Sequence, residues 1–331
     1  MLKLSSHYQT AQWLDEETYM TQPFSQAILR LNPKPATTFL NLSHFPLLSP
    51  QEETPPANYR TLREALEAGC LAITEVSEQG TVPALRAENT GSLPVLLVDG
   101  EELIGAKQNR ILNLTILVPA KTSINIPVSC VEVGRWSYQS RDFARANRTA
   151  YASLRAQKAA QVSANLRHSS HRQSEQGEIW RDIAAKSSRT HTHSATGAMG
   201  DMFSNVGTNI EDFVQSMPAW PNQVGAIFAI NGRISGLELF GIPGVWSGFH
   251  DQLVRSYALD AIDADKRAFR APELATAQHF LASVARVDDV ERYAAVGLGN
   301  DLRAHNRGLT AAGLEYNDTL IHLSAFAIRN A

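Results

Sequence analysis

The segment from Leu71 to Cys130 constrains the fold most, because its apolar residues occur in short runs that turn-forming residues interrupt. Apolar and polar residues alternate within each run, and Gly, Pro, Asn or Ser separates one run from the next, as is typical of β-strands. The connections are shorter than the crossovers that parallel strands require. We therefore expect an antiparallel sheet or sandwich, with strands AITEVS, PALRAEN, PVLLVDG, NRILNLTILV and SINIPVSC.

One of these strands also predicts which side chains face the core. Successive residues of a strand point to opposite faces. In NRILNLTILV, one apolar face is therefore formed by Leu112, Leu114, Ile116 and Val118. Asn113 and Thr115 lie on the opposite face, which we expect to be in contact with water.

Local motifs predict elements elsewhere in the chain. Thr61 and Glu64 have the spacing of a capping box, which predicts a short helix. Asn231-Gly232 lies between two apolar runs and predicts a hairpin, because both turn residues require a positive φ. The tail around Asn317-Asp318 predicts a closing hairpin. Further helices are expected around 179–183, 199–213, 246–262 and 272–287, and a first strand over 37–48.

The segment from Arg141 to Arg172 is strongly basic, with seven Lys or Arg residues and one acidic residue, Asp142. Its apolar residues recur at roughly helical spacing, which predicts a helix. A basic helix could contact phosphates or nucleic acid, but such a face is more often solvated. Few aromatic residues are present to stack on bases, so we expect a solvated basic face.

Together these patterns predict an α+β fold, with an antiparallel β-sheet or sandwich in the first half and helices plus β-hairpins in the second half. Residues 1–36 are expected to form an N-terminal appendage that ends in a Pro-rich turn. A β-rich region follows over 37–140, and an α+β region over 141–331. A single domain over 37–331 is the alternative.

Composition and charge narrow the class of protein. The formal net charge is −3 over 331 residues, which argues against a nucleic-acid partner. The two cysteines, Cys70 and Cys130, do not indicate a disulfide framework. The N-terminus lacks the apolar core of a signal peptide, and no apolar run is long enough to span a bilayer. We therefore expect a soluble cytoplasmic protein without a membrane partner. A homo-oligomer is left open.

The polar stretch GEELIGAKQNR is expected to be a hairpin junction between two strands. Glu101 and Glu102 would point to opposite faces of an extended chain, so they cannot form an acid–base dyad. One of them could still act as an acid or base that faces a pocket. Arg110 is in phase with the apolar face, where an unpaired guanidinium is unfavourable. It therefore needs a partner, which is either one of the glutamates or a ligand phosphate or carboxylate.

The end of the last predicted strand, SCVEVGRW, adds further candidates. Cys130, Glu132 and Arg135 come near the same region if the neighbouring strands are antiparallel. A nucleophilic Cys130 would need an adjacent base or cation to lower its pKa. An inert buried thiol is the favoured interpretation, since free cysteines are often core residues.

Motifs of common enzyme and metal sites do not occur. His168, His171, His191 and His193 are loosely spaced among Ser and Gly residues with no nearby Cys, so we expect a solvated loop and no metal. The sequence has no GxGxxG, Walker loop, GxSxG or HExxH. Rossmann, P-loop, α/β-hydrolase and common metalloprotease interpretations are therefore disfavoured.

Longer blocks of the sequence resemble a known family. DGEELIGAKQNRILNLTILVPA followed by IPVSCVEVGRWSY resembles the hallmark block of a prokaryotic domain family associated with ADP-ribosylglycohydrolases and rhodanese/phosphatase-superfamily proteins. QVGAIFAINGRISGLELFG and LVRSYALDA are similar to its second block, and VGLGNDLRAHN with LIHLSAF to its end. The resemblance covers the chain from about Thr37. It implies a link to ADP-ribose or other NAD-derived nucleotides by association, and it assigns no catalytic role or cofactor.

Two functional hypotheses follow. In the first, the chain binds or processes a phosphorylated, NAD-derived small molecule such as ADP-ribose. In the second, it is a non-catalytic structural or protein-interaction module with a buried ion-pair network that fixes strand register. The ligand-binding candidates are Lys107, Gln108, Asn109, Arg110, Glu132, Arg135 and Trp136, the acid or base candidates are Glu101 and Glu102, and the candidate reactive thiol is Cys130. Whether the chain is an enzyme stays open.

Overall fold

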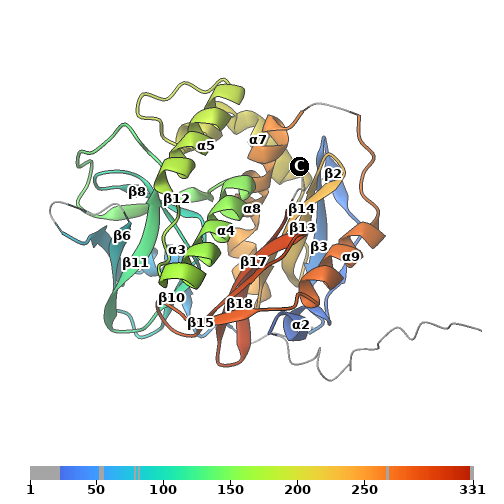
Figure 1. Ribbon diagram of the computed structural model, residues 1–331, viewed down its shortest axis with the longest axis horizontal. Coiled ribbons are helices and arrows are strands. Elements are labelled where there is room, and N and C mark those ends of the chain that lie inside the picture. The colour runs from blue at the N-terminus through green and yellow to red at the C-terminus, as the bar shows by residue number, and fades with distance from the viewer. Residues whose placement is uncertain (1–22, 52–55, 78–79, 81–82, 266–267, 329–331) are drawn as a thin grey trace, which may run out of the picture.

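The computed structural model describes residues 23–51, 56–77, 80, 83–265 and 268–328, and these form an α+β fold, as predicted. Figure 1 shows two large sheets with helices packed around and between them. The helices are α2 (Pro23–Ile28), α3 (Leu62–Glu67), α4 (Ala152–Ser169), α5 (Gln176–Arg189), α6 (Gly200–Asn205), α7 (Gly207–Ser216), α8 (Pro243–Asp263) and α9 (Leu274–Ala285).

The first large sheet has six antiparallel strands in the order β12-β8-β9-β11-β6-β5. Its two edge strands meet at a bridge between Thr74 and Asp142, so the sheet curls into a barrel. One apolar cluster fills the inside of this barrel. The strands are β5 (Leu71–Glu75), β6 (Ala84–Asn89), β8 (Glu101–Gly105), β9 (Arg110–Leu112), β11 (Thr122–Cys130) and β12 (Phe143–Thr149).

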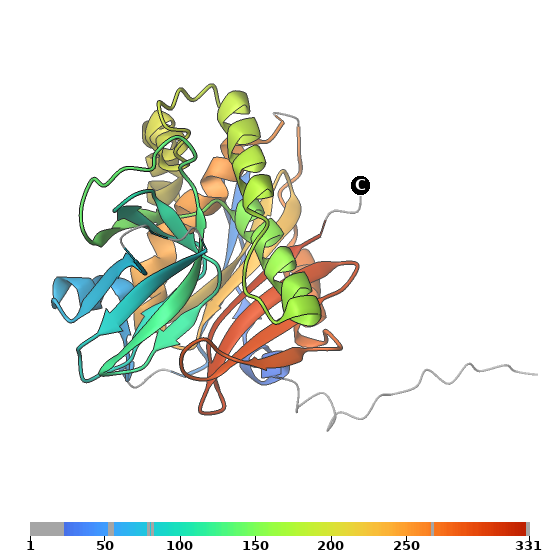
Figure 2. The same ribbon diagram turned by 60° about the vertical axis from the view of Figure 1, so that its left-hand side comes forward.

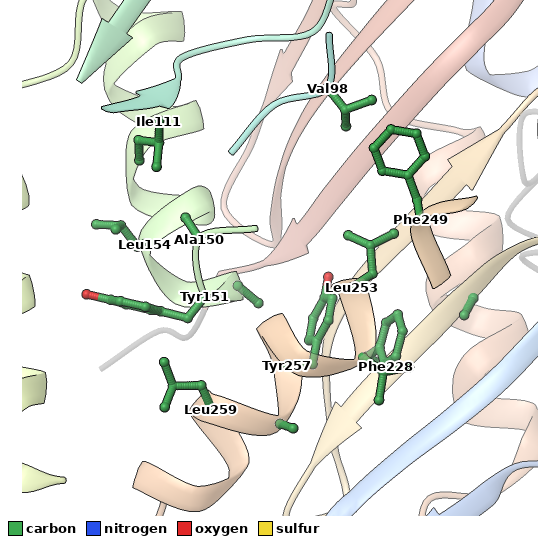
Figure 3. Packing of buried hydrophobic residues seen from close by; sticks show 14 of the residues in the cluster. Val98, Ile111, Ala150, Tyr151, Leu154, Phe228, Phe249, Leu253, Tyr257 and Leu259 are labelled. Carbon is green, nitrogen blue, oxygen red and sulfur yellow. The ribbon is translucent and has the colours of Figure 1, made fainter. Parts of the chain in front are cut away.

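The second large sheet has nine strands, from both ends of the described chain. α8 packs on one face of the sheet, where Tyr257 stacks on Phe228 with ring centroids 4.0 Å apart (Figure 3). α2 and α9 pack on the other face. The strands are β1 (Asn32–Pro33), β2 (Thr37–Phe39), β3 (Leu42–Leu48), β13 (Gln223–Ile230), β14 (Arg233–Phe240), β15 (Glu291–Ala294), β16 (Asn300–His305), β17 (Leu309–Tyr316) and β18 (Thr319–Ala327).

A small third sheet consists of β4 (Arg60–Thr61), β7 (Val95–Leu97) and β10 (Ile116–Val118). The predicted continuous strand NRILNLTILV is therefore wrong, because its first part is β9 of the barrel and its last part is β10. Asn113 and Thr115, at the break, are buried and not wet. Their polar groups are used: the Asn113 Oδ1 accepts a hydrogen bond from Ser129, and the Thr115 hydroxyl from the Asp99 amide.

The strongest local motifs are confirmed. The Thr61 hydroxyl accepts from the Glu64 amide at the start of α3, and the Glu64 carboxylate accepts from the Thr61 amide. Asn231 and Gly232, with φ of 51° and 74°, join β13 to β14. Asn317-Asp318 joins β17 to β18. The predicted strand over 37–48 is instead a tight hairpin of β2 and β3.

The basic segment differs from the prediction. Phe143–Thr149 is strand β12 of the barrel, and the helix begins only at Ala152. The helix face that carries Arg155 and Lys158 is not solvated, since both side chains are fully buried in ion pairs with acidic residues of distant segments. α4 lies between the barrel and the nine-stranded sheet, as Figure 2 shows.

The described part of the predicted N-terminal appendage packs against the core. Phe24 and Ile28 of α2 are buried in the cluster that α9 covers, and β1 pairs with β3. Residues 1–22 lie outside the described residues. Among the described helices, none is long and apolar enough to cross a membrane.

Candidate ligand-binding site

One end of the barrel gathers three polar side chains on its inner face. Arg110 on β9 lies opposite Cys130 on β11 and opposite Leu103 on β8. Directly opposite residues of antiparallel strands share a face, and Leu103 belongs to the barrel interior. Glu75 follows the inward Ile73 by two residues on β5, so it also points inward. Barrel mouths of this kind are frequent ligand sites.

Arg110 is fully buried and only partly hydrogen-bonded. Its Nη1 donates to the Gln108 Oε1 at 2.9 Å, and its guanidinium carbon lies 5.6 Å from the centre of the Trp136 ring. Within the described residues, its Nε and Nη2 have no hydrogen-bond partner. Burial lowers the pKa of Arg110, although Cys130 and Glu75 act in the opposite direction. An unpaired buried guanidinium is costly, so this group favours an anionic partner.

The predicted pairing of Arg110 with one of the adjacent glutamates is not present. The Glu101 Oε1 accepts from the Arg145 Nε at 2.8 Å, and its Oε2 from the Val98 amide. Glu102 pairs with Arg148. Burial raises the pKa of both carboxyl groups, and the arginines of β12 only partly offset it. Both glutamates thus pair with arginines that lie more than forty residues later in the chain. The sequence of a single hairpin could not predict these pairs.

Four other predicted site residues bind one another. Arg135 donates to Glu132 at 2.9 Å, to the Ala106 carbonyl at 2.7 Å and to the Asn109 Oδ1 at 3.0 Å. Burial alone would raise the pKa of Glu132, but hydrogen bonds from Arg135 and Thr196 outweigh it and lower the pKa. Gln108 donates to the Glu132 carbonyl. These residues therefore fix the turn between β8 and β9, and little of their hydrogen-bonding capacity remains for a ligand.

Cys130 lies beneath this turn. Its thiol donates to the Gln108 Oε1 at 3.0 Å. Burial raises the pKa of the thiol, and Arg110 only partly opposes this. A raised pKa keeps the group in the thiol form at neutral pH, which is not the nucleophilic form.

Two exposed aromatic residues form the rim of the mouth. Trp136 and Tyr138 have relative exposures of 47% and 52%. The Lys107 Nζ lies 5.4 Å from the centre of the Trp136 ring and 5.0 Å from that of Tyr138. A hollow of about 890 Å³ adjoins this rim and spans the seam where β5 meets β12. Its lining residues are Thr74, Glu75, Ser77, Tyr138, Gln139, Ser140 and Arg141.

Glu75 is a candidate site residue that the sequence interpretation missed. Both of its carboxylate oxygens are buried and, in the part of the chain that the structure describes, lack a hydrogen-bond partner. The signal was present, because Glu75 lies within the run AITEVS, in phase with the apolar Ile73. An acidic residue at the inward end of a strand needs a donor, just as Arg110 needs an acceptor.

A second polar cluster lies deeper, between α4 and the nine-stranded sheet, and is internally paired. Arg155 binds Glu238 through two hydrogen bonds of 2.6 and 3.1 Å and contacts Asp99 at 3.3 Å. Lys158 binds Asp99 and the Asn113 carbonyl. Burial lowers the pKa of Lys158 to about 8, against the opposing effect of Asp99. This cluster is enclosed, so the barrel mouth is the better ligand site.

The histidines are not arranged as a metal site. His168, His171, His191 and His193 are all exposed. Among the described residues, no group of three or more His, Cys, Asp or Glu side chains is placed to hold a metal ion.

A family model described as the ARG and Rhodanese-Phosphatase-superfamily-associated Protein domain matches residues 30–326. No curated protein and no solved structure matches the chain significantly.

Proposed function

The chain belongs to the ARG and Rhodanese-Phosphatase-superfamily-associated Protein domain family, and we propose that its barrel mouth binds a phosphorylated, NAD-derived small molecule such as ADP-ribose. The observation that carries this proposal is Arg110, a buried guanidinium with two N–H-bearing nitrogens that lack partners in the described chain. A phosphate oxygen is a strong acceptor for such donors. The family name adds an association with ADP-ribose chemistry, which is context and not a physical argument.

The rim supplies contacts for the rest of such a ligand. Trp136 and Tyr138 offer exposed ring faces on which a planar base can stack. Lys107, above both rings, adds a second positive charge near the phosphate. Because the Trp136 ring lies over Arg110, the ligand reaches the guanidinium when this ring turns aside. Glu132, Arg135 and Asn109 support the turn from behind. Binding, and no chemical step, is assigned to these residues.

A structural module is the second candidate function. It is supported by the three buried glutamates, Glu101, Glu102 and Glu132, each of which already has an arginine partner. If Arg110 belongs to such a network, its removal should destabilise the fold. The two candidates therefore differ in what replacement of Arg110 does.

We expect Arg110→Met to weaken ligand binding and to preserve the fold. Loss of a charge-assisted bidentate contact should weaken ADP-ribose binding by at least about tenfold. The free energy of unfolding should change by no more than about 1 kcal/mol, because few interactions of Arg110 are lost and a buried charge is removed. Titration calorimetry with ADP-ribose, NAD and AMP, together with urea unfolding, measures both effects.

Arg86→Met is the matched control, because Arg86 lies on the exposed side of β6 and contacts Ser123. It should bind ligand like the wild type. Absence of binding to all three nucleotides at millimolar concentration would refute the proposed function. A loss of several kcal/mol in Arg110→Met would instead support the structural module.

A further inference from the structure

Glu75, Lys107 and Trp136 converge on one point at the barrel mouth. A Cβ atom placed on Gly80 would lie 3.2 Å from the Glu75 Oε2, 3.3 Å from the Lys107 Cδ and 3.4 Å from the Trp136 Cζ2. The carboxylate of Glu75 therefore lies near the aliphatic part of the Lys107 side chain and near the aromatic ring that the proposed ligand would contact. It also lines the hollow at the seam of the barrel.

The two buried charges at this mouth do not form an ion pair. Glu101, Glu102 and Glu132 each form an ion pair with an arginine. Among the ion pairs of the described residues, none within 4.0 Å joins Glu75 to Arg110. Yet the two groups are close enough for Glu75 to raise the pKa of Arg110. Among the described residues, the mouth thus contains an acceptor without donors and donors without an acceptor. One molecule that satisfies both must carry an anionic group and, a short distance away, hydrogen-bond donors.

We propose that Glu75 accepts hydrogen bonds from the ribose hydroxyls of the ligand, so that the site selects ribonucleotides over 2′-deoxyribonucleotides. This inference rests on the proposed function. A carboxylate accepts only, and its two oxygens match the two donors of a vicinal diol. Acidic residues contact ribose hydroxyls in this way in dinucleotide-binding folds. The negative charge of Glu75 also repels phosphate, which directs the phosphates toward Arg110 and Lys107.

The test is the ratio of two dissociation constants. Wild-type protein should bind ADP roughly tenfold to a hundredfold more tightly than 2′-deoxy-ADP, as expected for loss of a hydrogen bond to a charged group. In Glu75→Gln, the ratio should fall to about threefold or less, because the remaining amide is a neutral and weaker acceptor. Titration calorimetry gives both constants, with pyrophosphate as a ligand that lacks a sugar.

Glu88→Gln is the control for loss of a nearby negative charge, since Glu88 is exposed on β6. It should leave the ratio unchanged. Unfolding in urea checks that both variants are folded. Equal binding of ADP and 2′-deoxy-ADP by the wild type would overturn the role of Glu75 and leave the proposed function standing. Failure of ADP, 2′-deoxy-ADP and pyrophosphate alike to bind would overturn both.

Discussion

Replacing Arg155 with methionine is expected to lower the free energy of unfolding by about 3–5 kcal/mol, because it leaves the buried Glu238 carboxylate without its arginine partner. Arg155 is fully buried and binds Glu238 through both terminal nitrogens and Asp99 through Nε. It connects α4 to β14 and to Asp99, in the loop between β7 and β8. Tyr257 donates to Glu238 at 3.0 Å, but one hydroxyl cannot neutralise this charge. Urea unfolding followed by circular dichroism measures the loss.

The same helix provides a matched control. Arg167 of α4 pairs with Glu291 at the surface, where both side chains are about one-third exposed. Surface pairs contribute about 0–1 kcal/mol, so Arg167→Met should be nearly neutral. Adding Glu238→Gln to Arg155→Met should recover part of the loss, since the amide removes the unpaired charge. Equal losses in Arg155→Met and Arg167→Met would show that the buried network does not stabilise the fold.

Acid is expected to destabilise the protein through His44. This side chain is fully buried on β3, and burial first and His250 second lower its pKa to about 3 from an ordinary 6.5. In the unfolded chain His44 takes up a proton as the pH falls below 6.5, whereas in the fold it does so only near pH 3. Its contribution is therefore lost progressively between these values. From about pH 7 to about pH 4.5 this linkage removes roughly 2–3 kcal/mol.

The surroundings of His44 allow a sharp comparison. Gln223 contacts its Nε2 at 3.0 Å, and His250, whose Nδ1 binds Asp251, packs against its ring. His44→Gln offers an amide oxygen at about the same place but does not titrate. This variant should therefore lose less stability than the wild type when the pH is lowered. His168→Gln, an exposed histidine, should follow the wild-type profile. Identical pH profiles for His44→Gln and the wild type would contradict the assignment.

The sequence predicted those parts of the fold that depend on neighbouring residues. The capping box at Thr61 and the Asn231-Gly232 turn involve residues that are at most three positions apart, so their patterns are readable without the fold. Alternation also identified Arg110 as a group that needs a partner. The same rule identifies Glu75, once the inward phase of Ile73 is taken into account.

The partners of buried charges could not be predicted in this way. Glu101 and Glu102 bind arginines of β12, and Arg155 binds a glutamate of β14, all across long separations in sequence. A basic helix with no acidic residues near it in the sequence is expected to be solvated. In α4, however, the acidic residues that pair with the buried cations come from other elements. The break in NRILNLTILV has the same origin. The Asn113 Oδ1 accepts a hydrogen bond from Ser129 and its carbonyl accepts one from Lys158, so Asn113 does not continue a strand.

The seam of the barrel has a dynamic consequence. At the seam, Thr74 of β5 forms an isolated bridge with Asp142, the residue that directly precedes β12, whereas β6 and β11 form a continuous ladder. Amide hydrogens near the seam should therefore exchange with solvent by local opening, well before those of β11. Glu75 lies on one side of the seam, and Tyr138 and Arg141 on the other. A molecule seated between them would hold the two sides together, so its binding should appear as slower deuterium uptake along β5.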